Sequence, residues 1–230
     1  MRLLNAHDLT IGYQKPILDN LKLEIHAGDF VGLLGANGSG KSTLVKTLLG
    51  IIPALKGHSH LEIEAGQVAY VPQRMKINAS IPLTCEEFLE LKLNKKITTD
   101  EIAKALEWVD LAGFQKKSIH ELSGGQLQRL FLAYAIISKP KILFLDEATE
   151  GMDVQAMSRF FDRLKKYVED EQAALIFVSH DLSAVSDHCN RVLCLHQQDI
   201  VFDGDPRSPE FHTCLHSIYG EKSFIHEHRH

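Results

Sequence analysis

The sequence lacks a surplus of positive charge. Among its 230 residues, Lys and Arg number 25 while Asp and Glu number 30, which gives a formal net charge of −5. A protein that binds nucleic acid without sequence preference needs excess cations to neutralise the phosphates. The composition therefore argues against a nucleic-acid partner.

Long apolar runs and paired cysteines are also missing. The longest apolar stretches, such as Phe30–Ala36 and Ile142–Leu145, fall far short of the ~20 residues that cross a bilayer. The N-terminus lacks the apolar centre of a secretion signal. The four cysteines include no C-x-x-C pair, which favours reduced thiols in the cytosol. If the protein serves a membrane process, we expect another chain to supply the membrane part.

Strand and helix patterns alternate along the chain without an internal repeat. Continuous apolar runs predict strands buried on both faces at Phe30–Leu34, Ile142–Leu145 and Ala174–Val178. Further strands are expected at Leu21–Ile25, Val68–Val71, Arg191–Leu195 and Ile200–Phe202. Helical spacing is found at Ser42–Gly50, Thr84–Leu93, Thr99–Val109, Ser123–Ser138, Val154–Glu171 and Asp181–Cys189. The sequence predicts an α/β fold with a largely parallel sheet and an inserted helical block.

The strongest motif follows the first buried strand and opens a helix. It matches G-x-x-x-x-G-K-[ST], a loop whose glycines let backbone amides approach phosphate oxygens. Lys41 is expected to reach the β- and γ-phosphates, and the Ser42 hydroxyl to bind Mg²⁺. The alternative is a glycine-rich turn that binds nothing. The predicted ATP-binding residues are Gly35, Ala36, Asn37, Gly38, Ser39, Gly40, Lys41, Ser42 and Thr43.

Two carboxylates end the buried strand at Ile142–Leu145. Asp146 is predicted to hold Mg²⁺, and Glu147 to polarise a water for attack on the γ-phosphate. The alternative is an ordinary acidic turn after a strand. The phosphate loop elsewhere in the sequence favours the catalytic interpretation.

A second glycine pair opens a later helix. Ser123 and Gln126 have the spacing of a capping box, so the segment Leu122-Ser-Gly-Gly-Gln is first of all a helix start. Gly124 and Gly125 are poor helix formers, and together they expose backbone amides in the first turn. One ATP needs only one phosphate loop. We therefore expect this second phosphate-binding element to contact a nucleotide that is held by another molecule.

These motifs, in this order and with Gln73 and His180, resemble the ATP-binding subunits of ABC transporters over essentially the whole chain. The resemblance implies a RecA-like P-loop NTPase core with an N-terminal antiparallel β region and an inserted α-helical subdomain. We expect one ABC ATPase domain over residues 1–220, with its core at 1–73 and 140–220 and the insertion at 74–139. Residues 221–230 form a His-rich tail.

The resemblance also implies roles for single residues. Two copies would pair head to tail, with each ATP between the phosphate loop of one copy and the Leu122–Gln126 signature of the other. Gln73 is similar to the Gln that contacts Mg²⁺ and the attacking water, and His180 to the switch His at the γ-phosphate. Tyr13 is similar to the aromatic residue that stacks on adenine, and Asp153 to the Asp of the dimer-contact loop.

Two positions depart from the family pattern. Ala148 stands where Pro usually follows the catalytic Glu, which fixes this turn less rigidly but leaves both carboxylates in place. Gly151-Met152 replaces the commoner Ala-Leu of the dimer-contact loop. The coupling between the two ATP sites is where a difference from the family is expected.

Smaller stretches resemble the zinc importers of bacteria within this family, although manganese and iron importers share many of them. They include Tyr70-Val-Pro-Gln, Glu150-Gly-Met-Asp-Val and Asp203-Gly-Asp-Pro. The tail places His226, His228 and His230 two residues apart, a spacing that allows weak Zn²⁺ binding. The alternative is a solvated terminus.

The resemblance implies a transport ATPase with ATP and Mg²⁺ as ligands and zinc as cargo. Its partners would be a second copy, membrane permease subunits and, indirectly, an extracytoplasmic metal-binding protein. The expected location is the cytoplasmic face of the bacterial inner membrane, as a peripheral protein. A soluble ABC protein acting on ribosomes or DNA is the alternative, but this chain has one phosphate loop and no heptads. A P-loop kinase or GTPase is disfavoured by the Leu122–Gln126 segment and by the missing Asn-Lys-x-Asp motif.

Overall fold

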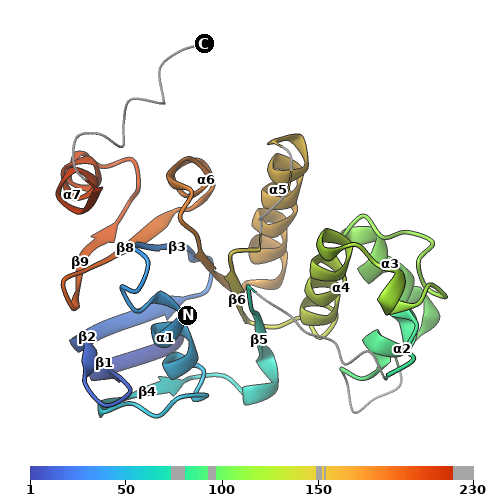
Figure 1. Cartoon of the computed structure of the whole chain (residues 1–230), viewed down its shortest axis with the longest axis horizontal. Coiled ribbons are helices and arrows are strands. Elements are labelled where there is room, and N and C mark those ends of the chain that lie inside the picture. The colour runs from blue at the N-terminus through green and yellow to red at the C-terminus, as the bar shows by residue number, and fades with distance from the viewer. Residues whose placement is uncertain (74–80, 93–96, 149–151, 153, 220–230) are drawn as a thin grey trace. The chain divides into compact units, whose positions relative to one another are not determined.

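The computed structural model describes residues 1–73, 81–92, 97–148, 152 and 154–219. The chain divides into two compact units, which are coloured by residue number in Figure 1. The first unit joins Met1–Ile63 to Ala174–His230, and the second comprises Glu64–Ala173.

The first unit contains the predicted N-terminal antiparallel region. Strand β1 pairs with a neighbour on each side, in the order β2-β1-β4. Alternation in the sequence explains β2, since Leu21, Leu23 and Ile25 are buried while Lys22 between them is exposed. The bounds are β1 (Arg2–Gly12), β2 (Pro16–His26) and β4 (Lys56–Leu61).

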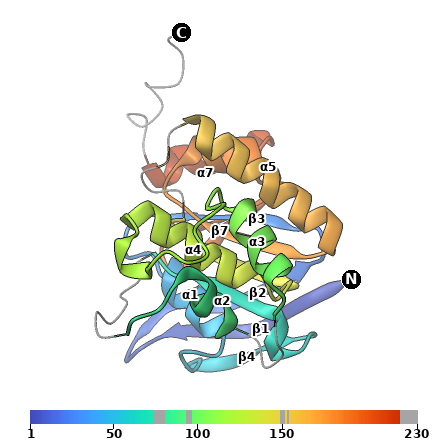
Figure 2. The same cartoon turned by 90° about the vertical axis from the view of Figure 1, so that its right-hand side faces the viewer.

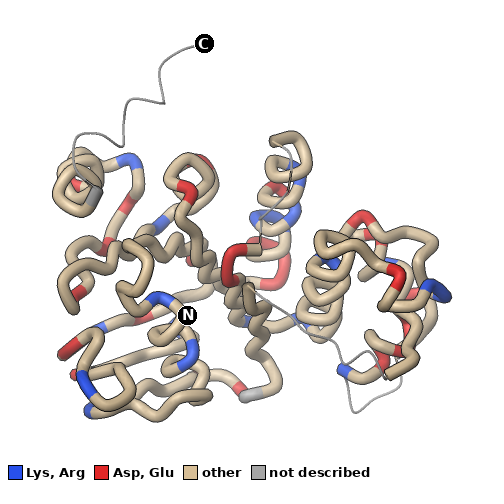
Figure 3. The backbone as a smooth tube through the Cα atoms, in the orientation of Figure 1, with Lys and Arg blue, Asp and Glu red and all other residues tan. Residues whose placement is uncertain are grey.

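A second group of strands in this unit is mostly parallel, as expected. Strand β3 lies between β7 and β8 and is parallel to both, while β9 pairs antiparallel with β8. Every residue of β3 and β7 is buried and none of them is charged. Figure 3 marks the Lys, Arg, Asp and Glu positions along the backbone. The elements are β3 (Phe30–Gly35), β7 (Ala174–Val178), β8 (Arg191–His196), β9 (Asp199–Gly204), α1 (Lys41–Leu48), α6 (Leu182–His188) and α7 (Pro209–Tyr219). Helix α1 contacts β1, β3 and β4, α6 contacts β3, and α7 packs on β9.

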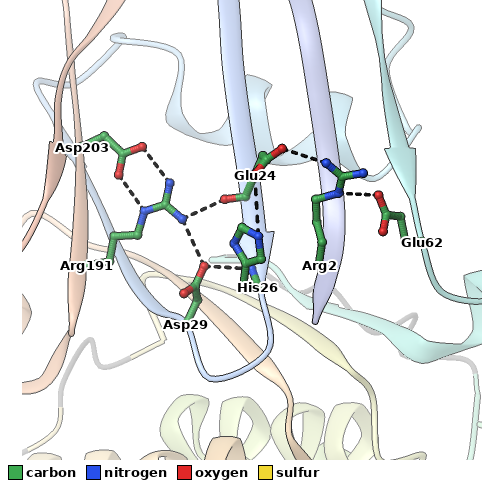
Figure 4. A network of polar contacts seen from close by, with 7 residues as sticks. All are labelled: Arg2, Glu24, His26, Asp29, Glu62, Arg191 and Asp203. Atoms are coloured by element: carbon green, nitrogen blue, oxygen red, sulfur yellow. Dashed lines mark hydrogen bonds and ion pairs between the residues drawn. The ribbon is translucent and has the colours of Figure 1, made fainter.

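An arginine network ties these strands together (Figure 4). The Arg191 guanidinium donates two parallel hydrogen bonds to the Asp203 carboxylate, from Nε at 2.6 Å and from Nη2 at 2.7 Å. Its Nη1 donates to the Glu24 carbonyl at 2.8 Å and to Asp29 Oδ2 at 3.1 Å. Bidentate pairs of this kind are the stronger and more directional ion pairs. One side chain therefore joins β8 and β9 to β2 and to the turn that leads into β3.

The second unit combines a short parallel strand pair with most of the helices. Strands β5 and β6 are parallel, and helix α4 contacts β5, α2 and α3. The ring of Phe88 on α2 lies 5.0 Å from that of Phe131 on α4, and Figure 2 shows α2, α3 and α4 together. The helices are α2 (Cys85–Glu90), α3 (Thr99–Trp108), α4 (Gly124–Ile136) and α5 (Val154–Glu171), with 3₁₀ turns at Ala65–Gln67 and Ile119–Glu121. The strands are β5 (Val68–Val71) and β6 (Ile142–Asp146).

None of the helices in the described part of the chain has both the length and the apolar character that a membrane crossing requires.

Candidate functional site

The predicted phosphate loop joins β3 to α1 in the first unit. Gly38 and Gly40 both have left-handed backbones, with φ of +83° and +101°, which glycine adopts without steric cost. Gly40 precedes α1, so it offers no side chain to cap the helix. A helix start of this kind is completed well by a phosphate, because the helix dipole and the N–H groups both favour an anion.

Lys41 lies almost buried against this loop. Its ammonium donates hydrogen bonds to the carbonyl oxygens of Gly35 at 2.7 Å and Ala36 at 3.1 Å. The Ser39 hydroxyl is buried close to Gly35, where an added Cβ would lie 2.5 Å from it, and it has no hydrogen-bond partner among the described residues. A buried cation, an unpaired hydroxyl and a helix start form a donor set that fits the phosphate groups of a nucleotide.

His180 leaves the strand next to the one that carries the phosphate loop. Because β3 and β7 are parallel, with Leu33 opposite Val178, both strands end at the same edge. The Ser179 amide donates to the Leu33 carbonyl at 3.4 Å, and Asp181 caps α6 through the Ala184 amide at 3.1 Å. The exposed His180 is therefore held on a short, fixed segment at the edge where the phosphate loop begins.

Tyr13 follows β1 in the turn that leads to β2. Its side chain is 64% exposed, which leaves a ring face accessible to a planar ligand. The start of β2 lies against the phosphate loop, since a Cβ on Gly40 would come within 2.7 Å of Ile17. The turn with Tyr13 is therefore at the phosphate-loop end of the unit.

The acidic pair lies at the end of β6 in the second unit, with Asp146 as its last residue and Glu147 directly after it. Asp146 is 5% exposed, and Glu147 has a left-handed backbone with φ of +51°, a conformation uncommon for residues other than glycine. Gln73 donates a side-chain hydrogen bond to Glu147 Oε2. Gln128 of α4 donates to the Glu147 carbonyl at 3.3 Å. The two predicted catalytic residues Gln73 and Glu147 are therefore in contact.

Tyr70 of β5 donates a hydrogen bond from its hydroxyl to Asp146 Oδ2 at 3.3 Å. Burial, followed by the negative charge of Asp146, raises the pKa of Tyr70 well above its usual value. The phenol therefore stays protonated at neutral pH and remains a donor toward the carboxylate.

The Leu122–Gln126 segment forms the predicted capping box at the start of α4. The Ser123 hydroxyl accepts a hydrogen bond from the Gln126 amide at 3.3 Å, and Gln126 Oε1 accepts one from the Ser123 amide at 3.1 Å. Gly124 and Gly125 have no left-handed φ, and a Cβ on either would meet nothing within 4 Å. Packing against the described residues thus gives no reason for these glycines, whereas close approach of an outside ligand would.

The donor chemistry fits a magnesium ion. Mg²⁺ prefers oxygen ligands and uses few protein side chains beside phosphates and water. The sequence predicts three such ligands, namely the Ser42 hydroxyl in the first unit and the Gln73 amide and Asp146 carboxylate oxygens in the second. No cluster of three His, Cys, Asp or Glu suited to a metal ion occurs among the residues that the structure describes. The predicted Asp153, His226, His228 and His230 lie outside the described residues.

Two residues near the acidic pair were not predicted from the sequence. Tyr70 and Gln128 contact Asp146 and Glu147 from elements distant in the chain. Gln128 carries no distinct signal within an amphipathic helix. Tyr70 does carry a signal, because its hydroxyl is a polar group in an otherwise apolar strand. Only the pairing of β5 with β6 shows which residue that hydroxyl contacts.

Comparisons with known proteins match these features. The family model described as "ABC transporter" matches residues 18–150. The zinc import ATP-binding protein ZnuC 2 of Aliivibrio fischeri is 40% identical over 214 residues, covering 91% of this chain and 86% of that protein. Similar proteins of this kind and similar ATPase structures are numerous.

Two solved structures are informative. An inward-facing transporter assigned to the metal-chelate type of ABC transporter is 26% identical, with a TM-score of 0.76, covering 90% of this chain and 84% of that one. A dimeric ATP-binding cassette with ADP and phosphate bound has a TM-score of 0.78 at 22% identity, covering 90% of this chain and 100% of that one. The fold, the matched motifs and the relatives agree, and the chain therefore belongs to the ABC transporter family, as one of its ATP-binding proteins.

Proposed function

We propose that this chain is the ATP-hydrolysing subunit of a bacterial importer for a divalent metal, and that the metal is zinc. The main support for zinc as the cargo is the 40% identity to a zinc import ATP-binding protein over 91% of the chain. The likeness to a metal-chelate type transporter supports a metal as cargo. A manganese or iron importer is the alternative.

ATP is bound by residues of the phosphate loop and by Tyr13. The loop from Gly35 to Thr43 holds the phosphates through backbone amides and the Lys41 ammonium, and Tyr13 stacks on the adenine. Ser42, Gln73 and Asp146 would hold Mg²⁺, which would supply positive charge beside the phosphates.

Hydrolysis uses residues around the γ-phosphate. Glu147 accepts a proton from the attacking water, and Gln73, which contacts Glu147, orients both. His180 donates a hydrogen bond to the γ-phosphate and stabilises the negative charge on its oxygens during hydrolysis. Ser123, Gly124 and Gly125 act on the ATP of a second copy, and Asp153 belongs to the contact between copies.

The conformational change that ATP binding and hydrolysis cause is transmitted to separate permease subunits. In this proposal the ATPase is a peripheral protein on the cytoplasmic face of the inner membrane, and an extracytoplasmic metal-binding protein delivers the cargo. ATP binding closes two copies, and hydrolysis reopens them, so that the permease alternates its access.

The Glu147→Gln substitution tests the chemistry. The amide keeps the size of the side chain but accepts no proton, so turnover should fall by about 10²–10⁴-fold while ATP binding persists. Steady-state ATPase assays and nucleotide titration measure the two quantities. Near-normal turnover in this variant would remove Glu147 from the proposed role.

The cargo is tested separately by metal uptake. Cells that lack the gene should lose growth in zinc-depleted medium and regain it with the wild-type chain, but not with Lys41→Ala. Uptake of radioactive zinc, manganese and iron ions is then compared. If the wild-type chain restores uptake of manganese or iron but not of zinc, the zinc assignment is wrong while the ATPase assignment stands.

A further inference from the structure

Tyr70 and Asp146 face the same side of a parallel strand pair. The register places Tyr70 opposite Phe144, and Asp146 lies two residues further along β6. Side chains alternate along a strand, so positions 70, 144 and 146 share one face. Two residues span about 6.6 Å along a parallel strand, a distance that a tyrosine side chain leaning along the strand can bridge.

The Tyr70 hydroxyl lies where it contacts the Asp146 carboxylate. Tyr70 is half-buried and Asp146 is 5% exposed, so the phenol oxygen and the carboxylate meet where water is scarce. A phenylalanine would fill the same space without a polar atom that needs a partner. The bond, at 3.3 Å, restrains Asp146 Oδ2 and so favours one rotation of the carboxylate about its last torsion, which is otherwise broad.

The same segment also reaches the neighbouring carboxylate. Three residues after Tyr70, Gln73 donates to Glu147. Strand β5 and its extension thus supply one donor to each acidic residue at the end of β6. Tyr70 donates to Asp146, the predicted magnesium ligand, and Gln73 donates to Glu147, the predicted base.

We propose that Tyr70 is a positioning residue that orients the Asp146 carboxylate for the Mg²⁺ of bound ATP. The inference rests on the proposed function, because it assumes that Asp146 holds this ion. Residues that orient a metal ligand commonly contribute 10–100-fold to metal affinity.

The test is Tyr70→Phe, which deletes one oxygen atom. Tyr167→Phe is the matched control, since Tyr167 lies in the same unit and donates its hydroxyl to the Pro140 carbonyl at 2.8 Å. Both are made in the Glu147→Gln background, which keeps ATP intact. Mn²⁺ replaces Mg²⁺, and its dissociation constant from the protein loaded with stoichiometric ATP is measured by electron paramagnetic resonance.

We expect Tyr70→Phe to raise the dissociation constant of Mn²⁺ by about tenfold. ATP affinity in the presence of a chelator should not change, and Tyr167→Phe should stay within twofold of its parent. Equal Mn²⁺ affinity in the Tyr70→Phe protein and its parent would overturn the inference.

The Asp146→Asn variant separates the inference from the proposed function. If Asp146→Asn leaves Mn²⁺ affinity intact, the magnesium role of Asp146 is wrong and the inference fails with it. If Asp146→Asn loses affinity and Tyr70→Phe does not, the inference alone fails. Adding Tyr70→Phe to Asp146→Asn should cause no further loss, whereas damage to the fold would lower affinity in both backgrounds.

Discussion

At the scale of single residues, Gly38 and Gly40 share a left-handed backbone but differ in their surroundings. A Cβ on Gly38 would meet nothing within 4 Å, whereas a Cβ on Gly40 would lie 2.7 Å from Ile17. A left-handed backbone costs an L-residue about 1–2 kcal/mol, and overpacking adds typically about 1–3 kcal/mol. The same substitution should therefore have two different costs within one loop.

We predict that Gly40→Ala lowers the free energy of unfolding by about 2–5 kcal/mol and Gly38→Ala by about 1–2 kcal/mol. Urea unfolding of the two variants and the wild type, followed by circular dichroism, gives the values. Equal losses would mean that Ile17 moves aside freely and that the backbone alone sets the cost at Gly40.

Residues of the site differ in how far the sequence reveals them. The phosphate loop and the Asp146–Glu147 pair are predictable because their chemistry depends on neighbours in the chain. The contacts of Tyr70 and Gln128 are not, since each depends on which strand or helix lies beside β6. The left-handed backbone of Glu147 is likewise unpredictable from its residue type.

At the scale of elements, three helices of the second unit begin with the same device. Helices α2, α3 and α4 each start with a complete capping box, formed by Thr84 with Glu87, Thr98 with Glu101, and Ser123 with Gln126. Two of these boxes have no proposed contact with nucleotide. They provide a control that separates the structural role of Ser123 from its proposed role at ATP.

We predict that Ser123→Ala and Thr98→Ala each lower the free energy of unfolding by about 1 kcal/mol, the usual cost of losing an N-cap side chain. Only Ser123→Ala should also lower ATPase turnover, by tenfold or more, because its hydroxyl is proposed to act on the partner's ATP. Thermal unfolding and steady-state ATPase assays on the same preparations measure both effects. If Thr98→Ala reduces turnover as much, the loss comes from stability and not from nucleotide contact.

Strand β4 and helix α7 are not predicted from the sequence, for different reasons. Strand β4 has the sequence Lys-Gly-His-Ser-His-Leu, which lacks apolar alternation, and it is recognisable only by its pairing with β1. Helix α7 did carry a signal, since Ser208 precedes Pro209 and its hydroxyl accepts a hydrogen bond from the Phe211 amide at 3.3 Å. A Ser cap followed by Pro at the first helical position is a common helix start.

At the scale of the whole molecule, the proposed active form contains two copies. A Cβ on either glycine of the Leu122–Gln126 segment would meet no described residue within 4 Å, which favours a ligand brought by another copy. ATP bound between the copies would contribute to the contact, and hydrolysis would weaken it. The oligomeric state should therefore depend on nucleotide.

We predict that the Glu147→Gln protein sediments as a dimer with ATP and Mg²⁺ and as a monomer without nucleotide. Analytical ultracentrifugation measures both states, and Lys41→Ala, which should bind ATP weakly, is the control that stays monomeric. A monomer under all conditions would count strongly against an ATP-dependent dimer of the isolated chain.

The split of the first unit along the sequence has a consequence for synthesis on the ribosome. Strand β3 finds its two parallel neighbours only in β7 and β8, and the whole second unit is made between them. At about 5–20 residues per second, the apolar β3 waits roughly 7–30 seconds with both edges unpaired. An unpaired apolar strand invites pairing with other nascent chains. The strand that leads into the phosphate loop is therefore the segment of this protein most in need of a chaperone during translation.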